Sequence, residues 1–171
     1  YKQYGPLEVL VRCFLNQTAS NWQLIVYHDG PDIDFDVLMS RLSLEAVGRI
    51  AYHSTPYRFN DFGHSLRDIA LKEITGDYVL ITNGDNYYVP IFIETMTNLI
   101  GMHEPDVVMF DMIHSHNFPG GRKLPPYSFF QTEYCRGGID IGSAIIRAPL
   151  AKQAGFRDKT HDGDATYFED I

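Results

Sequence analysis

Cysteine is scarce in this sequence, because 171 residues include only Cys13 and Cys135. Two cysteines are too few for a disulfide framework, so free thiols and a reducing, cytoplasmic location are the expectation. Long apolar runs are also missing. Even the apolar stretch at residues 78–82 is far shorter than the roughly 18 residues that a membrane-spanning helix needs. We therefore expect a protein without a transmembrane segment.

Positive charge is in short supply as well. Lys and Arg together number 14 against 22 Asp and Glu, which gives a formal net charge of −8. This balance disfavours general binding to nucleic acid or to an anionic membrane surface, although a local site can still hold a small anion. The sequence also lacks a Walker loop and a Gly-x-Gly-x-x-Gly segment after a strand. These absences argue against a P-loop kinase and a Rossmann dehydrogenase, which hold phosphate with such loops.

What the sequence does contain is an alternation of strand-like and helix-like segments, in an ordinary globular composition with 44% hydrophobic and 21% charged residues. Apolar residues at three- and four-residue steps predict helices, and short β-favouring apolar runs predict strands. Helices are expected near residues 7–15, 35–44, 66–74 and 90–103 and after Pro149, and strands at 22–27, 49–53, 78–82, 106–111 and 141–147. This order predicts one α/β domain over residues 1–171, with a Rossmann-like, open, mostly parallel sheet flanked by helices. Residues 114–140 are rich in Gly, Pro and aromatics, and we expect an irregular loop or a hairpin there.

Two polar segments directly follow predicted strands, where open α/β sheets bind their ligands. One is His28-Asp29-Gly30 and the other is Asn83-Gly84-Asp85-Asn86. Mg²⁺ bound with phosphate takes one or two carboxylates, and Asp85 with Asn83 or Asn86 suits that role. The same residue types are also common turn formers, so spacing alone leaves a plain turn as the alternative.

Other metal-like patterns in the sequence are weaker. His114 and His116 would share a face on a strand and could form a metal pair, but no third ligand is identifiable, so a solvated loop is the favoured interpretation. The segment His161-Asp162-Gly163-Asp164 resembles part of a calcium loop without the remaining ligand spacing, and we interpret it as a polar turn. Cys13 lies on the apolar face of a predicted helix and is interpreted as a core residue.

Several motifs, in order along the chain, are similar to those of family 2 glycosyltransferases, which have the GT-A fold. Residues 15–18 and 21–26 (LNQT and NWQLIV) resemble the family's QT…NWEIIVVDDGS segment. The other matching segments are residues 28–30 at the Asp-Asp-Gly position, 63–68 at the G…ARN helix start, 75–81 (TGDYVLI) at AGEYILFL, 83–86 at the DxD position, 142–147 and 155–158 on the acceptor side, and 169–170 at the late Glu-Asp pair. The order and spacing of these segments cover nearly the whole chain.

The resemblance implies a role for five residues. Asp29 would recognise the nucleotide base, usually uracil, and Arg67 would contact the ribose or the diphosphate. Asn83 takes the place of the first Asp of DxD, and Asp85 is the second, the expected ligand of Mn²⁺ or Mg²⁺. Asp170 would be the general base. The implied reaction moves a sugar from a nucleotide-sugar, most simply a UDP-sugar, to a hydroxyl of a saccharide, lipid-linked or other acceptor with inversion, and the metal neutralises charge on the departing diphosphate.

The departures from the family pattern keep two alternatives open. The family's first strand would precede Tyr1 and its acceptor region would follow Asp170, so we expect a GT-A domain without these two parts. Asn83 removes one carboxylate, which favours a catalytically weak nucleotide-sugar-binding module as the alternative to an active transferase. A nucleotidyltransferase of related architecture is the other alternative, and it would release pyrophosphate rather than UDP.

Overall fold

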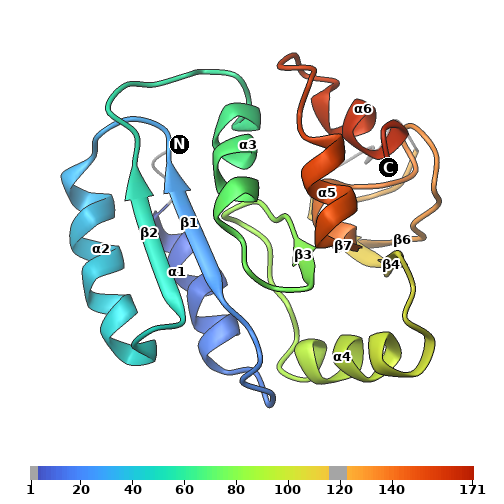
Figure 1. Ribbon diagram of the computed structural model, residues 1–171, viewed down its shortest axis with the longest axis horizontal. Helices are drawn as coiled ribbons and strands as arrows, with labels where there is room; N and C mark the ends of the chain where they lie inside the picture. Colours follow the sequence, from blue (N-terminus) through green and yellow to red (C-terminus); the bar gives the residue numbers. More distant parts are fainter. Residues whose placement is uncertain (1–3, 116–122) are drawn as a thin grey trace.

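The computed structural model describes residues 4–115 and 123–171, and Figure 1 shows the arrangement of its helices and strands. The helices are α1 (Tyr4–Leu15), α2 (Ile33–Ser43), α3 (His64–Glu73), α4 (Phe92–His103), α5 (Ala148–Ala154) and α6 (Gly163–Glu169). The strands are β1 (Leu24–His28), β2 (Ile50–Ser54), β3 (Tyr78–Leu80), β4 (Val107–Met109), β5 (Met112–His114), β6 (Ser128–Phe130) and β7 (Ala144–Arg147). The predicted α/β class is confirmed.

The strands form one parallel pair and two antiparallel groups. β1 and β2 run parallel, with Leu24 opposite Ile50 and His28 opposite Ser54. β7 lies between β3 and β4 and is antiparallel to both, so β3 and β4 run in the same direction. β5 and β6 pair as an antiparallel hairpin, which is one of the two forms expected for the region that begins at residue 114.

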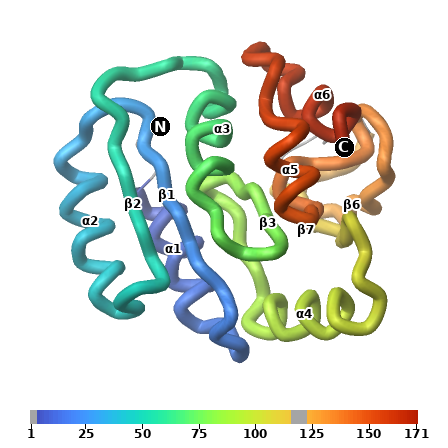
Figure 2. Tube along the Cα trace, in the orientation of Figure 1, coloured from blue at the N-terminus to red at the C-terminus, as the bar shows by residue number. Residues whose placement is uncertain are grey.

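Helix α3 lies in the middle of the molecule, between β1 on one side and α5 on the other (Figure 2). Its residues Leu66 and Leu71 are buried, whereas Ile69 and Ala70, which share the predicted apolar spacing with Leu66, are half-buried. Around it the molecule has two hydrophobic clusters. One joins α1 and α2 to β1 and to the start of α4, and it includes the buried Cys13. The other joins β7, α5 and α6.

Local hydrogen bonds explain where several elements begin. Asp32 is the N-cap of α2, and its carboxylate accepts the backbone N–H groups of Asp34 and Phe35. The predicted strand at residues 141–147 starts instead with a 3-10 turn, Ile141–Ser143. There the side chains of Asp140 and Ser143 cap each other's backbone. This turn delays β7 to Ala144, so only the second half of the predicted strand is extended.

Candidate active site

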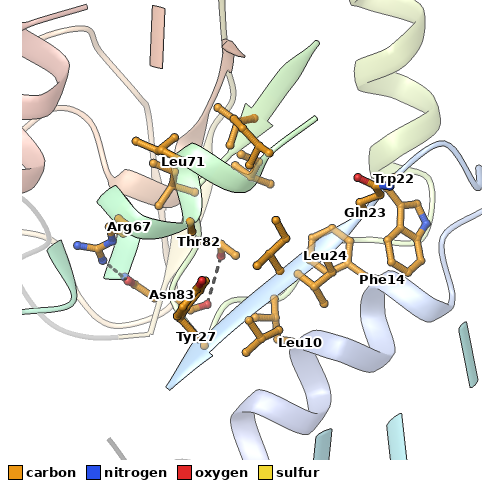
Figure 3. A pocket seen from close by; sticks show the side chains of 18 of the residues that line it. Leu10, Phe14, Trp22, Gln23, Leu24, Tyr27, Arg67, Leu71, Thr82 and Asn83 are labelled. Atoms are coloured by element: carbon orange, nitrogen blue, oxygen red, sulfur yellow. Dashed lines mark hydrogen bonds between the residues drawn. The ribbon is translucent and has the colours of Figure 1, made fainter. Parts of the chain in front are cut away.

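A large cavity lies between β1 and β3, with a volume of about 1390 Å³. Among the described residues, β1 pairs only with β2 and β3 only with β7, so both strands have an edge without a strand partner. Figure 3 shows Arg67 and Asn83 on one side of the cavity and Leu10, Phe14 and Leu24 on the other. Four of the five residues singled out from the sequence line this cavity, namely Asp29, Arg67, Asn83 and Asp85.

Asp29 follows β1, and its carboxylate is hydrogen-bonded to the loop after β2. Its Oδ1 accepts the backbone N–H of Phe59 at 2.7 Å, and its Oδ2 accepts that of Asn60 at 3.1 Å. The guanidinium of Arg58 lies 3.8 Å from Oδ2. Asp29 therefore fixes the loop that forms one wall of the cavity, and its proposed contact with a nucleotide base stays a prediction.

Arg67 lies at the centre of the site. Its guanidinium connects α3 by hydrogen bonds to the loop after β3 and to α6. Nη2 donates to Asn83 Oδ1 at 2.8 Å, as Figure 3 shows. Nη1 donates to Asp164 Oδ1 at 3.0 Å and to His64 Nδ1 at 2.9 Å. The side chain is 13% exposed, so the guanidinium is a largely buried positive charge held by neutral and anionic acceptors.

The loop after β3 presents its two candidate side chains differently. The side-chain carbonyl oxygen of Asn83 accepts a hydrogen bond from Arg67. Asp85 is exposed, and within residues 4–115 and 123–171 its carboxylate has no hydrogen bond or ion pair. Asn86 holds the loop in place instead, since its amide donates to Thr82 Oγ1 at 3.1 Å.

This arrangement fits a divalent cation that is held mainly by its substrate. Mg²⁺ commonly takes one or two protein carboxylates and completes its shell with phosphate oxygens and water. In the described part of the chain, no three His, Cys, Asp or Glu residues are grouped as a metal cage. Asp85, which lines the cavity and is exposed, is a carboxylate that could hold such a cation there. The segment with His114 and His116, for which a solvated loop was favoured over a metal pair, is not tested, because His116 lies outside the described residues.

His64 and Asp164, which were not among the predicted site residues, complete the cluster around Arg67. The His64 ring is 1% exposed and stacks on Phe156, with 5.3 Å between ring centroids. Arginine can only donate, so Nδ1 of His64 is the acceptor and its proton sits on Nε2, which donates to the carbonyl of Thr160 at 2.9 Å. Burial and the nearby Arg67 charge lower the pKa of His64, in keeping with a neutral ring.

Asp164 belongs to the first turn of α6, not to a free polar turn as its sequence suggested. Burial raises the pKa of its carboxyl, and the charge of Arg67 opposes that effect. The glycine that precedes Asp164, Gly163, is the residue in the sequence that relates to the position of Asp164. A Cβ there would lie 2.5 Å from His64 Nε2 and 2.6 Å from the carbonyl oxygen of Asp158, so only glycine lets α6 approach α3 this closely.

Asp170, the fifth predicted residue, lies at the other end of α6 as its C-cap. Its Oδ2 accepts a hydrogen bond from Arg157 Nε at 2.5 Å. It does not line the cavity with the other four. The structure thus brings four of the predicted residues to one cavity and places the fifth in a separate ion pair. Its role as a base stays a prediction.

Comparison with known proteins identifies the class. The family model described as Glycosyl transferase family 2 matches residues 1–149. The chain therefore belongs to this family of glycosyltransferases, as the resemblance implied. Among curated protein sequences, none matches the chain significantly.

Solved structures confirm the fold. The chain is similar to the crystal structure of S. aureus TarS 1–349, with a TM-score of 0.71 and 18% identity over 99% of this chain and 51% of that one. It is similar also to the complex of the same TarS fragment with UDP, with a TM-score of 0.72 and 16% identity over 95% of this chain and 49% of that one. The chain spans about half the length of these proteins. No helix in residues 4–115 or 123–171 is both long and apolar enough to cross a membrane.

Proposed function

We propose that this chain is the donor-binding part of an inverting glycosyltransferase that uses a UDP-sugar. The observation that carries the proposal is the convergence of Asp29, Arg67, Asn83 and Asp85 on one cavity. Their order along the sequence matches the family's donor motifs. The UDP complex of the similar TarS fragment supports the choice of nucleotide.

Each side chain in the cavity has a role in this proposal. Asp85, the exposed carboxylate, would hold Mn²⁺ or Mg²⁺ against the diphosphate. When bound, that cation supplies charge neutralisation for the leaving group. Arg67 would donate to the ribose or the diphosphate from a fixed position, since four residues already orient its guanidinium. Asp29 would keep the loop at residues 59–60 beside the base.

The proposed reaction is a single displacement at the anomeric carbon. The acceptor hydroxyl oxygen forms a bond to that carbon from the face opposite the diphosphate, and the bond to the diphosphate oxygen breaks as UDP leaves. The hydroxyl proton passes to a carboxylate acting as general base. The acceptor would be a saccharide, a lipid-linked sugar or another hydroxyl compound. The free Cys13 and Cys135 support the proposal that the reaction takes place in the cytoplasm.

One observation favours the second candidate, a nucleotide-sugar-binding module with weak activity. Asn83 replaces a carboxylate of DxD, and its one good acceptor oxygen is taken by Arg67. A module of this kind would bind UDP without releasing it from a UDP-sugar. A nucleotidyltransferase, the third candidate, would release pyrophosphate, so the identity of the product separates all three.

Calorimetric titration of UDP into the chain, with and without Mn²⁺, tests the proposal. We expect Mn²⁺-dependent binding that is stronger for UDP than for GDP and is lost in Asp85→Ala. Asp34→Ala, which removes an aspartate from the first turn of α2, is the matched control and should bind UDP normally. Equal binding of UDP with and without Mn²⁺, or by Asp85→Ala and the parent chain, would contradict the assignment of Asp85.

A further inference from the structure

His64 contacts Arg67, which lines the cavity, although His64 is not itself a lining residue. Its ring nitrogen Nδ1 lies 2.9 Å from Nη1 of the guanidinium. The other arm of the same guanidinium donates to Asn83, which also lines the cavity. We propose that His64 is a positioning residue for the nucleotide, because it holds Arg67 in the orientation in which the guanidinium meets the donor. This inference rests on the proposed function and deepens it.

The hydrogen bonds of Arg67 divide its guanidinium into a held side and an open side. Nη1 lies within hydrogen-bond distance of three acceptors, which are the carbonyl of Phe62 at 3.3 Å, His64 Nδ1 at 2.9 Å and Asp164 Oδ1 at 3.0 Å. Within residues 4–115 and 123–171, Nη2 makes one hydrogen bond, to Asn83 Oδ1 at 2.8 Å. Each of these nitrogens carries two hydrogens, so Nη2 keeps one N–H for a ligand in the cavity.

The ring of His64 is itself fixed, which is what a positioning residue requires. It is 1% exposed and stacks on Phe156, with 5.3 Å between the ring centroids and 19° between the planes. Its Nε2 donates to the carbonyl of Thr160 at 2.9 Å. Gly163 packs so closely that a Cβ there would lie 2.5 Å from Nε2. The ring therefore has no room to turn, and the lone pair of Nδ1 faces Arg67.

Asp164 also accepts from Nη1, but its carboxylate constrains the arginine less than the histidine does. The side chain of Asp164 is 38% exposed, whereas His64 is buried. Water competes for a partly exposed ion pair, so the geometry of the pair is held loosely. Phe156 adds to the constraint, because Arg67 Cζ lies 5.5 Å from the centroid of the ring on which His64 stacks. His64 thus sets the direction of the guanidinium, and Asp164 balances its charge.

His64 can accept from Arg67 only while its ring is neutral. A protonated ring would place an N–H and a positive charge against Nη1, and the hydrogen bond would be lost. The charged groups that face the ring are Arg67 from α3, Asp61 from the loop before it, Asp158 from the loop after α5 and Asp164 from α6. Burial and Arg67 keep the pKa of His64 below its ordinary value, against the opposing effect of the carboxylates. The neutral ring is therefore the form present at neutral pH.

Two substitutions separate the two hydrogen bonds of the His64 ring. In His64→Asn the amide oxygen lies near the position of Nδ1, so an acceptor for Arg67 is kept and the bond to Thr160 is lost. In His64→Gln the amide nitrogen lies near the position of Nε2, so the bond to Thr160 is kept and the acceptor is lost. Arg67→Ala is the reference for a complete loss of the arginine. His161→Gln, which changes an exposed ring, is the control.

UDP affinity is measured by calorimetry with Mn²⁺ at neutral pH, beside urea unfolding of each variant. For His64→Gln we expect Kd to rise by about tenfold or more, toward the value of Arg67→Ala, because one hydrogen bond to a charged group is lost. For His64→Asn we expect a Kd within about threefold of the parent chain. His161→Gln should match the parent. A purely structural role for His64 would instead weaken UDP binding in step with the loss of stability, whichever hydrogen bond is removed.

The pH dependence of UDP affinity gives a second test, for which either His64 variant suffices if the other does not fold. Protonation of UDP and of the other groups affects parent and variant alike, so the ratio of their affinities reports His64. As the pH falls from about 7.5 to about 5.8, the parent should lose affinity relative to His64→Asn, and its advantage over His64→Gln should shrink. The sign follows because the neutral ring is the form that holds Arg67.

Several outcomes would overturn the inference. These are parent-like UDP binding by His64→Gln, equally weak binding by His64→Asn and His64→Gln, and affinity ratios that do not change with pH. Parent-like binding by Arg67→Ala also counts against it, because His64 would then have no nucleotide contact to position. A parent chain that does not bind UDP overturns the proposed function itself, and this result is distinct from the others.

Discussion

Asp68 Oδ1 accepts a hydrogen bond from the backbone N–H of Phe156 at 2.6 Å, which ties helix α3 to the turn after α5. The other carboxylate oxygen of Asp68 accepts from the ammonium of Lys159. Asp68 follows Arg67 directly along α3, but its side chain contacts the segment after α5 rather than the cavity. Arg67 serves the cavity, and Asp68 holds the segment that leads into α6.

Replacing Asp68 by alanine should destabilise the protein without touching the cavity. The N–H of the buried Phe156 would lose its acceptor, and an unsatisfied buried donor costs about 1–3 kcal/mol. Urea unfolding should show a lower free energy of unfolding at an unchanged m-value. Asp68→Asn keeps an acceptor oxygen and should lose clearly less. Equal losses in the two variants would mean that the charge facing Lys159, not the hydrogen bond, is what matters.

Adding a single methyl group at Gly163 should be harmful, because a Cβ there would meet His64 Nε2 and the backbone of Asp158. Overpacking of this kind typically costs about 1–3 kcal/mol. Gly101→Ala is the matched control, since Gly101 lies within α4 and a Cβ there has nothing within 4 Å. Alanine should stabilise that position by roughly 0.5–1 kcal/mol. Similar unfolding free energies for the two variants would show that the approach of α6 to His64 is looser than described.

How well the sequence predicted each element depends on how local its causes are. The strand at β1 was expected two residues early, and helices α1 to α4 were found close to their actual bounds, because apolar spacing reports burial directly. The hairpin of β5 and β6 had a weaker signal, because the Gly, Pro and aromatic composition of residues 114–140 left an irregular loop as the alternative. Each strand has three residues and is defined by pairing across a long connection, with Met112 opposite Phe130.

The same distinction applies to the candidate site. Asp29, Arg67, Asn83 and Asp85 could be named because each lies in a motif. The hydrogen bond between Arg67 and Asp164 joins residues 97 positions apart, and no local pattern encodes it. The sequence His-Asp-Gly-Asp at residues 161–164 is typical of a turn, so it did not indicate that α6 begins there. The packing of Gly163 against His64 decides the position of the Asp164 carboxylate.

Stability should fall as the pH drops from about 7.5 to 6, because of His64. Its pKa is lowered in the folded state by burial and by Arg67, so the unfolded state binds more protons near the ordinary histidine pKa of about 6.5. The stabilisation is present above that pKa and is lost below it. The raised pKa of Asp164 acts with the opposite sign, but in a lower pH range nearer the ordinary aspartate value.

Urea unfolding of the parent chain, His64→Gln and His161→Gln at several pH values tests this expectation. His161 is 87% exposed and is the control. His64→Gln should be less stable than the parent at pH 7.5 and should show a shallower loss of stability toward pH 6. A parallel pH dependence in the parent and His64→Gln would assign the proton uptake to another group.

An additional strand between β1 and β3 should stabilise the protein. The family resemblance implies a strand ahead of Tyr1, and we expect it to lie between β1 and β3, where both edges lack a strand partner among the described residues. The part of the cavity beyond the carboxyl ends of β1 and β3, where Asp29 and Asn83 lie, would stay open to the donor. Each apolar side chain that such a strand buries contributes about 1.5–3 kcal/mol.

A longer chain that includes this strand should therefore unfold at a higher urea concentration and with a larger m-value. The same extension with its apolar residues changed to serine is the control. Equal stability of the two extensions would show that the strand does not occupy the cavity.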